Sequence, residues 1–337
     1  MPHPHVLVIR LSAIGDIAMA AAVVRQAAVQ LPDATFTMIS QPFMHPLFTG
    51  LPNVRFIGVD ERADYRGLRG LWRLFRVVRQ QRPDRIADLH DVLRTQVLRG
   101  LLRLSGKRVS VIRKGRAARR RLTRRRHKVR RPLKTTFERY REVIEKCVGQ
   151  RLSPDAPVAA PDYAPGCIVP KKPKAVGIAP FAACAGKIYP LEKMQEVVAC
   201  FAACADTDVF LFGGGRRERA ILEEWAQRYP PACSIAGKLS LADELALIRR
   251  LSVMISMDSA NMHFASFVGT PVVSVWGATH PCAGFYGWQQ APDNAVCAGL
   301  PCSPCSIYGN KPCFRRDYRC LHSIPPAAII ARANTFL

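Results

Sequence analysis

The chain has 337 residues, which is enough for two ordinary domains because single domains cluster near about 100–200 residues. Hydrophobic residues make up 49% of it and charged residues 22%, so the composition excludes a disordered chain and predicts a sizeable core. The net charge of +25 predicts an acidic partner, and no apolar run approaches the roughly 20 residues of a membrane-spanning helix, so we expect neither a membrane span nor a cleaved signal.

The first half of the chain alternates short apolar runs with helical patterns. Apolar runs typical of buried parallel strands occupy residues 6–10, 35–40, 55–59 and 85–89. Helical periodicity follows the first run to about residue 30 and returns at 68–81 and 93–104. Alternating strands and helices predict a Rossmann-like, doubly wound parallel sheet. We therefore expect a first domain over residues 1–153.

A stretch rich in proline separates this half from the next. Residues 154–173 contain six prolines and have the composition of a linker. The alternation then restarts, with strands expected at 175–179, 208–212, 253–256 and 272–276, and helices at 191–205, 218–229, 241–251 and 262–267. We expect a second Rossmann-like domain over 174–322 and a C-terminal helix at 323–337, a candidate to pack back on the first domain. Two such domains predict a cleft that binds ligand.

The positive charge is concentrated in one segment. Residues 107–131 contain 14 Lys or Arg and no Asp or Glu. Such a run must face water, phosphate or an anionic membrane, so a solvated surface, nucleic acid, phospholipid headgroups and a phosphorylated glycolipid are all compatible with it. The residues of this segment that we assign to an anionic acceptor or membrane are Arg113, Lys114, Arg116, Arg119 and Arg120.

The twelve cysteines fall into two groups. Seven of them, from Cys147 to Cys282, lie in apolar stretches typical of buried reduced thiols, which predicts a cytosolic protein. The other five follow in a stretch rich in Gly and Pro, where Cys302 and Cys305 have metal-ligand or redox spacing. With Cys313 and Cys320 they are candidates for a structural zinc site, and reduced thiols that stabilise a loop are the alternative.

Two acidic positions follow predicted strands. Asp16 comes directly after Gly15, in the expected turn between the first strand and the first helix, where a carboxylate can accept a proton or cap a helix. Asp258 follows the strand expected at 253–256 and leads into a helix whose free N–H groups could hold a phosphate. Lys187 lies in the loop after the strand expected at 175–179 and could neutralise a diphosphate.

Three glycines in succession, Gly213 to Gly215, follow another strand but lack the spaced third glycine of a dinucleotide fingerprint. We interpret them as a simple turn.

Several segments together resemble one family. They are residues 8–16 (VIRLSAIGD), 187–190 (KIYP), 236–240 (AGKLS), 258–263 (DSANMH), 269–271 (GTP) and 277–279 (GAT). In this order and at these intervals they are similar to glycosyltransferase family 9, the ADP-heptose:lipopolysaccharide heptosyltransferases. The resemblance spans most of the chain and implies a GT-B architecture, in which two Rossmann-like domains face a central cleft, the first binding the acceptor and the second the nucleotide sugar.

The resemblance also implies roles for single residues. Asp16 matches the family's catalytic aspartate, the general base that deprotonates the acceptor hydroxyl. Lys187 matches the lysine on the donor diphosphate, and Asp258 matches the acid of the donor site. Ser259, Ala260 and His263 lie in the segment that cradles the phosphates, while Ser12 and Gly15 lie where the backbone approaches the acceptor sugar.

The implied reaction is inverting transfer of a heptose from ADP-L-glycero-D-manno-heptose to a lipopolysaccharide core, with no cofactor for catalysis. Another nucleotide sugar or acceptor glycan is the alternative within the family. A nucleic-acid-binding protein acting through residues 107–131 is the alternative from another class. For the enzyme we expect a lipid-linked acidic glycan and an anionic membrane surface as partners, no nucleic acid, and a cytoplasmic location at the inner face of the inner membrane.

Overall fold

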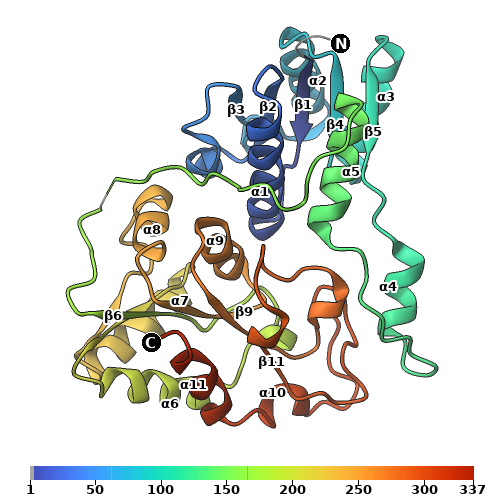
Figure 1. Cartoon of the computed structure of the whole chain (residues 1–337). Coiled ribbons are helices and arrows are strands. Elements are labelled where there is room, and N and C mark those ends of the chain that lie inside the picture. The colour runs from blue at the N-terminus through green and yellow to red at the C-terminus, as the bar shows by residue number, and fades with distance from the viewer. Residues whose placement is uncertain (1–3, 62, 165) are drawn as a thin grey trace. The chain divides into compact units, whose positions relative to one another are not determined.

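The computed structural model describes residues 4–61, 63–164 and 166–337 (Figure 1). The chain divides into two compact units, the first made of residues 1–114 and 136–162 and the second of residues 115–135 and 163–337. Each unit is built on one sheet whose strands all pair in parallel. The predicted α/β class with two doubly wound sheets is therefore confirmed.

The sheet of the first unit has five strands in the order β3-β2-β1-β4-β5. Their bounds are β1 His5–Ile9, β2 Thr35–Ser40, β3 Val54–Gly58, β4 Arg85–Asp88 and β5 Arg108–Val111. The strand order reverses between β1 and β4, which pair with Ile9 opposite Asp88. Ligands of doubly wound sheets bind at the carboxyl ends of the strands at such a reversal.

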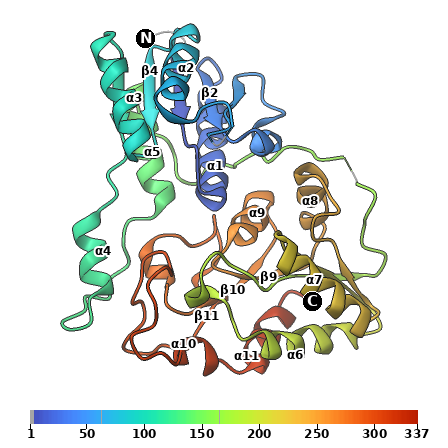
Figure 2. The ribbon, with the colours of Figure 1, turned by 180° about the vertical axis from the view of Figure 1, so that it is seen from behind.

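Helices cover both faces of this sheet. Helix α1 (Ile14–Gln30) contacts α5 (Thr136–Val148), and α2 (Gly67–Gln80) contacts α3 (Leu93–Leu104). Seen from behind, α2 and α3 lie side by side (Figure 2). Their inward faces bury Leu74, Val78 and Leu98 against Ile9 and other strand residues in one hydrophobic core. That burial is the main reason these short helices are stable.

The sheet of the second unit has six strands in the order β11-β10-β9-β6-β7-β8. Their bounds are β6 Lys174–Ala179, β7 Thr207–Leu211, β8 Ala232–Ser234, β9 Val253–Met257, β10 Val272–Trp276 and β11 Ala295–Cys297. Strands β9 and β10 are buried at every residue, as expected for the centre of a parallel sheet.

Seven helices belong to the described part of the second unit. They are α4 Arg116–Thr123, α6 Leu191–Ala202, α7 Arg216–Arg228, α8 Leu241–Ile248, α9 Ala260–Val268, α10 Arg319–His322 and α11 Pro326–Asn334. The C-terminal helix α11 contacts α6, β9 and β10 and buries Ile329 and Ala333 in the core of this unit. The C-terminal helix therefore packs in the core of the second unit and not, as the sequence suggested, on the first domain.

Residues 115–135 pack with the second unit, although the sequence suggested an uninterrupted first domain over 1–153. The reason is the set of aromatic and carbonyl partners that the second unit supplies to this basic segment. Arg119 lies over the ring of Phe285, and Leu133 N donates to Cys282 O at 2.9 Å. Neither α4 nor α5 was expected, because the run of arginines hides the short apolar pattern around them.

The start of the Pro-rich stretch is fastened to α1 of the first unit. Gln26 Nε2 donates to the carbonyl oxygens of Pro154 and Ala156, both at 2.8 Å, and Arg25 Nε donates to Ala159 O at 2.9 Å. Both side chains are only 1% exposed, so these bonds are made away from water. Residues 154–162 consequently belong to the first unit, and they contain no helix or strand.

The expectation that the scattered cysteines are buried is mostly wrong. Of the seven from Cys147 to Cys282, only Cys147 is buried; Cys167, Cys200, Cys204 and Cys233 are exposed. Cys233 is the outward residue of β8, between buried Ala232 and Ser234, because successive residues of a strand face opposite sides, and Cys167 and Cys204 lie outside the helices and strands. All twelve cysteines are free thiols in the structure.

Candidate active site

Asp16 lies at the strand-order reversal of the first unit. It occupies the first turn of α1, not the preceding turn as expected, because the helix already begins at Ile14. Its Oδ2 forms an ion pair with the guanidinium of Arg10, the residue that follows β1. Tyr140 Oη of α5 donates to Asp16 Oδ1 at 3.4 Å, and the Arg10 guanidinium lies 5.9 Å from the centre of the Tyr140 ring. Strand β1 and helices α1 and α5 together orient this carboxylate.

The loops after β1 and β4 meet beside Asp16. Ser12 Oγ and His90 Nε2 are 3.2 Å apart, and Arg10 Nη1 donates to Leu89 O at 2.8 Å. Burial is the largest cause that lowers the pKa of His90 from 6.5 to about 3, with the charges of Arg10 and Lys114 adding to it. His90 is therefore neutral at physiological pH, and its ring can exchange hydrogen bonds with Ser12 without adding charge.

Lys187 and Asp258 meet in the second unit. Strands β6 and β9 pair side by side, with Ala179 opposite Ser256, so the segments that follow them share one edge of the sheet. Lys187 Nζ lies 2.9 Å from Asp258 Oδ2, and the two side chains are 15% and 6% exposed. The predicted donor lysine and donor acid are thus brought together as a largely buried ion pair.

Close packing fixes the position of Lys187. A side chain on Gly186 would come within 2.8 Å of Ala278 Cβ and 3.0 Å of Gly309 O. Only glycine fits there, and Ala278 N donates to Gly186 O at 2.8 Å. On the other side of Lys187, Tyr189 Oη donates to Ile324 O at 2.7 Å. The lysine therefore projects from a segment that is anchored on both sides.

Helix α9 begins at this same edge. Ser259 precedes it, Ala260 is its first residue, and His263 is 6% exposed in its first turn. The Ser259 side chain does not cap the helix; its Oγ lies 3.1 Å from Ser256 Oγ. The first N–H groups of α9 therefore have no side-chain cap from Ser259, which suits an anion.

The structure reveals partners that the sequence did not. Arg10 and Tyr140 contact Asp16, His90 contacts Ser12, and Glu218 Oε2 accepts a hydrogen bond from Gly214 N at 2.7 Å in the predicted glycine turn. A charged residue directly after a buried strand was the available signal for Arg10. No local pattern pointed to His90 or Tyr140, because they reach the site from other elements.

The residues assigned to an anionic ligand are divided between the two units. Arg113 and Lys114 belong to the first unit, where Lys114 Nζ donates to Asp91 O at 2.8 Å. Arg116, Arg119 and Arg120 lie on α4, in the second unit.

Within the second unit, several cations of the basic segment bind the protein itself. Arg119 Nη1 donates to Tyr308 Oη at 2.8 Å, and its guanidinium lies 4.9 Å from the centre of the Phe285 ring. Arg125 lies 4.6 Å from the centre of the Phe314 ring, and Lys128 Nζ donates to Cys302 O and Pro304 O at 2.6 Å. Arg116 and Arg120 are exposed.

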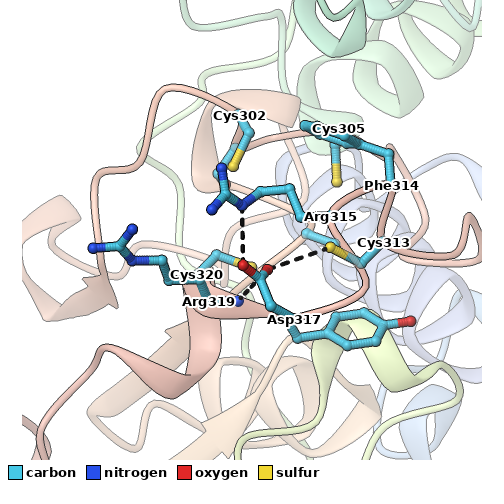
Figure 3. Close-up of a pocket in the computed structure, with 11 residues that line it drawn as sticks. Cys302, Cys305, Cys313, Phe314, Arg315, Asp317, Arg319 and Cys320 are labelled. Carbon is cyan, nitrogen blue, oxygen red and sulfur yellow. Dashed lines mark hydrogen bonds and ion pairs between the residues drawn. The ribbon is translucent and has the colours of Figure 1, made fainter.

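The four candidate zinc ligands line one small cavity. Cys302, Cys305, Cys313 and Cys320 surround it together with Arg315 and Asp317 (Figure 3). Asp317 binds Arg315 Nε at 3.1 Å and so offers its charge to an arginine. Within the described ranges, no group of three or more His, Cys, Asp or Glu is arranged to hold a metal ion.

The comparison with protein families decides the class of the protein. The profile of glycosyltransferase family 9 (heptosyltransferase) matches residues 71–312, which is more than half of the chain. The chain belongs to glycosyltransferase family 9. It is therefore an enzyme that transfers a glycosyl group, as the sequence motifs predicted.

Individual heptosyltransferases are similar to most of the chain. The lipopolysaccharide core heptosyltransferase OpsX of Haemophilus influenzae is 24% identical over 280 residues, which are 81% of this chain and 79% of that protein. The structure of Escherichia coli ADP-heptose lps heptosyltransferase II has a TM-score of 0.68 at 18% identity and covers 98% of both chains. That of E. coli heptosyltransferase WaaC with ADP-2-deoxy-2-fluoro heptose has a TM-score of 0.63 at 18% identity, covering 90% of this chain and 97% of that one. The GT-B fold class is confirmed.

Proposed function

We propose that this family 9 enzyme transfers a heptose from ADP-L-glycero-D-manno-heptose to a lipopolysaccharide core acceptor, with inversion at the anomeric carbon. The observation that carries the proposal is the family match, whose range spans Lys187 and Asp258, the residues that we propose for the donor site. Two further findings support it. OpsX is named a lipopolysaccharide core heptosyltransferase, and WaaC was solved with an ADP-heptose analogue.

In this proposal Asp16 is the general base. Its carboxylate accepts the proton of the acceptor hydroxyl as that oxygen forms a bond to the anomeric carbon. The bond from the anomeric carbon to the diphosphate oxygen breaks in the same step, and the electron pair leaves with ADP. A single displacement of this kind inverts the configuration. Arg10 and Tyr140 hold the carboxylate in place, so its orientation does not have to be created during the reaction.

In this proposal the second unit binds the nucleotide-sugar donor. Lys187 supplies a positive charge for the departing diphosphate, and the start of α9, with Ser259, Ala260 and His263, supplies N–H groups. The hydroxyl of Thr279, which follows β10, is buried and makes no hydrogen bond within the described part of the chain, so a ligand could satisfy it. With these groups we propose that catalysis needs no cofactor.

We further propose that the enzyme works in the cytoplasm, peripherally at the inner face of the inner membrane. The acceptor would be a lipid-linked glycan carrying phosphates. Exposed cations such as Arg116 and Arg120 are suited to its negative charge. Among the described residues, no helix is long and apolar enough to cross a membrane.

Calorimetric titration with ADP, GDP and UDP tests the donor. We expect selective binding of ADP and its loss in Asp258→Ala, while a preference for GDP or UDP would overturn the heptose donor but keep the family.

The structural zinc site of the C-terminal cysteines stays a separate prediction. Metal analysis of protein purified without added zinc tests it, and less than about half an equivalent per chain contradicts it.

A further inference from the structure

Helices α2 and α3 expose large apolar side chains on their outward faces. The side chains concerned are Leu68 (84% exposed), Trp72 (55%), Leu93 (77%), Val97 (43%) and Leu104 (88%). Single exposed apolar residues are ordinary, but here five occur on two adjacent helices of one unit. In the view from behind, these two helices lie side by side at the front of their unit (Figure 2).

The exposed residues form a second apolar stripe on each helix. Leu68 and Trp72 are four residues apart on α2, as are Leu93 and Val97 on α3, so each pair shares a helix face. The buried stripes of the same helices contain other residues, such as Leu74 and Leu98. Burial in the core of the first unit therefore does not account for the outer stripe.

The two pairs lie at the same end of the unit. Helices α2 and α3 both follow strands of a parallel sheet, β3 and β4, so both begin at the carboxyl end of the strands. Leu68, Trp72, Leu93 and Val97 are in the first two turns of their helices. Asp16, which follows β1, is at that end of the sheet too.

The charge of the same helices is entirely positive. Between them they carry seven arginines and no acidic residue. Arg94 and Arg99 pair with Glu61 and Asp88, whereas Arg69 and Arg76 are exposed. Apolar side chains that include a tryptophan, flanked by arginine, match the interfacial layer of a bilayer with anionic headgroups.

We propose that the outer face of α2 and α3 is a membrane-docking surface for anionic lipid. Leu68, Trp72, Leu93 and Val97 enter the boundary between headgroups and acyl chains, while Arg69 and Arg76 bind lipid phosphates. With 14 and 12 residues, the helices are too short to cross a bilayer and would lie in its plane. Because the four apolar residues lie toward the end of the unit that carries Asp16, docking brings that end close to the lipid, where a lipid-linked acceptor would be; only this last consequence rests on the proposed function.

The tryptophans make the proposal directly measurable. Trp72 is exposed, whereas Trp225, Trp276 and Trp288 are only 1%, 1% and 7% exposed. Vesicles of phosphatidylcholine and phosphatidylglycerol that carry brominated acyl chains should therefore quench the fluorescence of Trp72 in the full chain. We expect quenching and a blue shift, neither of which occurs in Trp72→Phe. Unchanged fluorescence of the vesicle-bound protein would overturn the proposal.

Co-sedimentation with the same vesicles separates apolar insertion from simple charge attraction. Leu68→Ser combined with Trp72→Ser should weaken binding about tenfold, whereas Phe43→Ser, which removes a 49% exposed aromatic ring elsewhere in the first unit, should not. Arg69→Gln combined with Arg76→Gln should weaken binding only to anionic vesicles.

Two results would contradict the assignment. The first is that the double variant Arg120→Gln with Arg126→Gln loses vesicle binding while the double variant of Leu68 and Trp72 keeps it. That result would assign the docking surface to the basic segment, residues 107–131. Absence of vesicle binding altogether would leave an acidic protein partner as the occupant. ADP titration of each variant keeps the two proposals apart, because an intact ADP site without vesicle binding overturns only the docking surface.

Discussion

Lys187 Nζ and Asp258 Oδ2 form an ion pair 2.9 Å long that is almost shielded from solvent. The two residues are far apart in sequence and meet because β6 and β9 are neighbours in the sheet. A buried charge is tolerated when it has a partner, so each of these residues stabilises the other in the free enzyme. Each is also a candidate for the donor site, so the pair links stability to ligand binding.

Replacing the lysine should therefore cost stability as well as affinity. In Lys187→Ala the Asp258 carboxylate loses its cation while still buried, and we expect the free energy of unfolding to fall by about 3–5 kcal/mol. Lys238→Ala is the matched control, because its ion pair with Glu223 is roughly half exposed and should contribute about 0–1 kcal/mol. Urea titration measures both. ADP affinity should drop for Lys187→Ala only, and an unchanged affinity would remove its donor role.

Asp16→Asn should abolish transfer while leaving the donor site intact. The amide keeps the shape of the side chain but accepts no proton, and we expect kcat to fall by about 10²–10⁴-fold. Calorimetry should give the wild-type affinity for ADP. Asp33→Asn, an exposed aspartate of the same unit, should retain activity. Normal turnover of Asp16→Asn would rule out its role as the general base.

His90 should make the enzyme less stable in acid. Its pKa is about 3 in the folded chain against 6.5 when unfolded, so below pH 6.5 the unfolded state binds a proton that the folded state does not. Stability then falls as the pH drops from 6.5 toward 3, by about 2–3 kcal/mol at pH 4.5. Unfolding titrations at pH 7 and 4.5 should show a smaller acid loss for His90→Asn. The exposed His322→Asn should behave as wild type, and equal losses in both variants would contradict the assignment.

Arg119 should stabilise the second unit although it lies in the most basic part of the chain. Arg119→Ala removes its contact with the Phe285 ring and its bond to Tyr308 Oη, and we expect a loss of about 2–3 kcal/mol. Arg120→Ala, on the exposed side of the same helix, should change stability by less than about 0.5 kcal/mol. Thermal or urea unfolding distinguishes the two. Similar losses of unfolding free energy in the two variants would mean that the charge of the arginine, and not its packing, stabilises the unit.

Local patterns predicted some elements to the residue. The strands Thr35–Ser40 and Val272–Trp276 agree because each is a short run that is buried almost throughout, and the helix Leu93–Leu104 agrees because Leu98 and Leu102 recur at helical spacing. The helix Thr136–Val148 was missed although Tyr140 and Ile144 face the core. It follows directly on the arginine-rich segment, whose polarity masked the start of its pattern.

The candidate site was predictable to a similar degree. Asp16, Lys187 and Asp258 could be selected because each follows a predicted strand and because the segments around them resemble one family. Arg10 carried a signal, a charge directly after a buried strand, but its ion pair with Asp16 depends on where α1 begins. Tyr140 could not be predicted as a partner, because it comes from a helix far along the chain. Predicting the ion pair between Lys187 and Asp258 requires the order of the strands in the sheet, and local sequence periodicity does not give that order.

The interruption of the first unit by residues 115–135 has a consequence for biosynthesis. The ribosome makes this segment long before Phe285, Tyr308 and Phe314, the rings on which its arginines pack. Domains generally fold as they emerge, but this stretch must wait until most of the second unit has been translated. Throughout that interval the most cationic part of the nascent chain lacks its aromatic partners, next to the phosphates of ribosomal RNA.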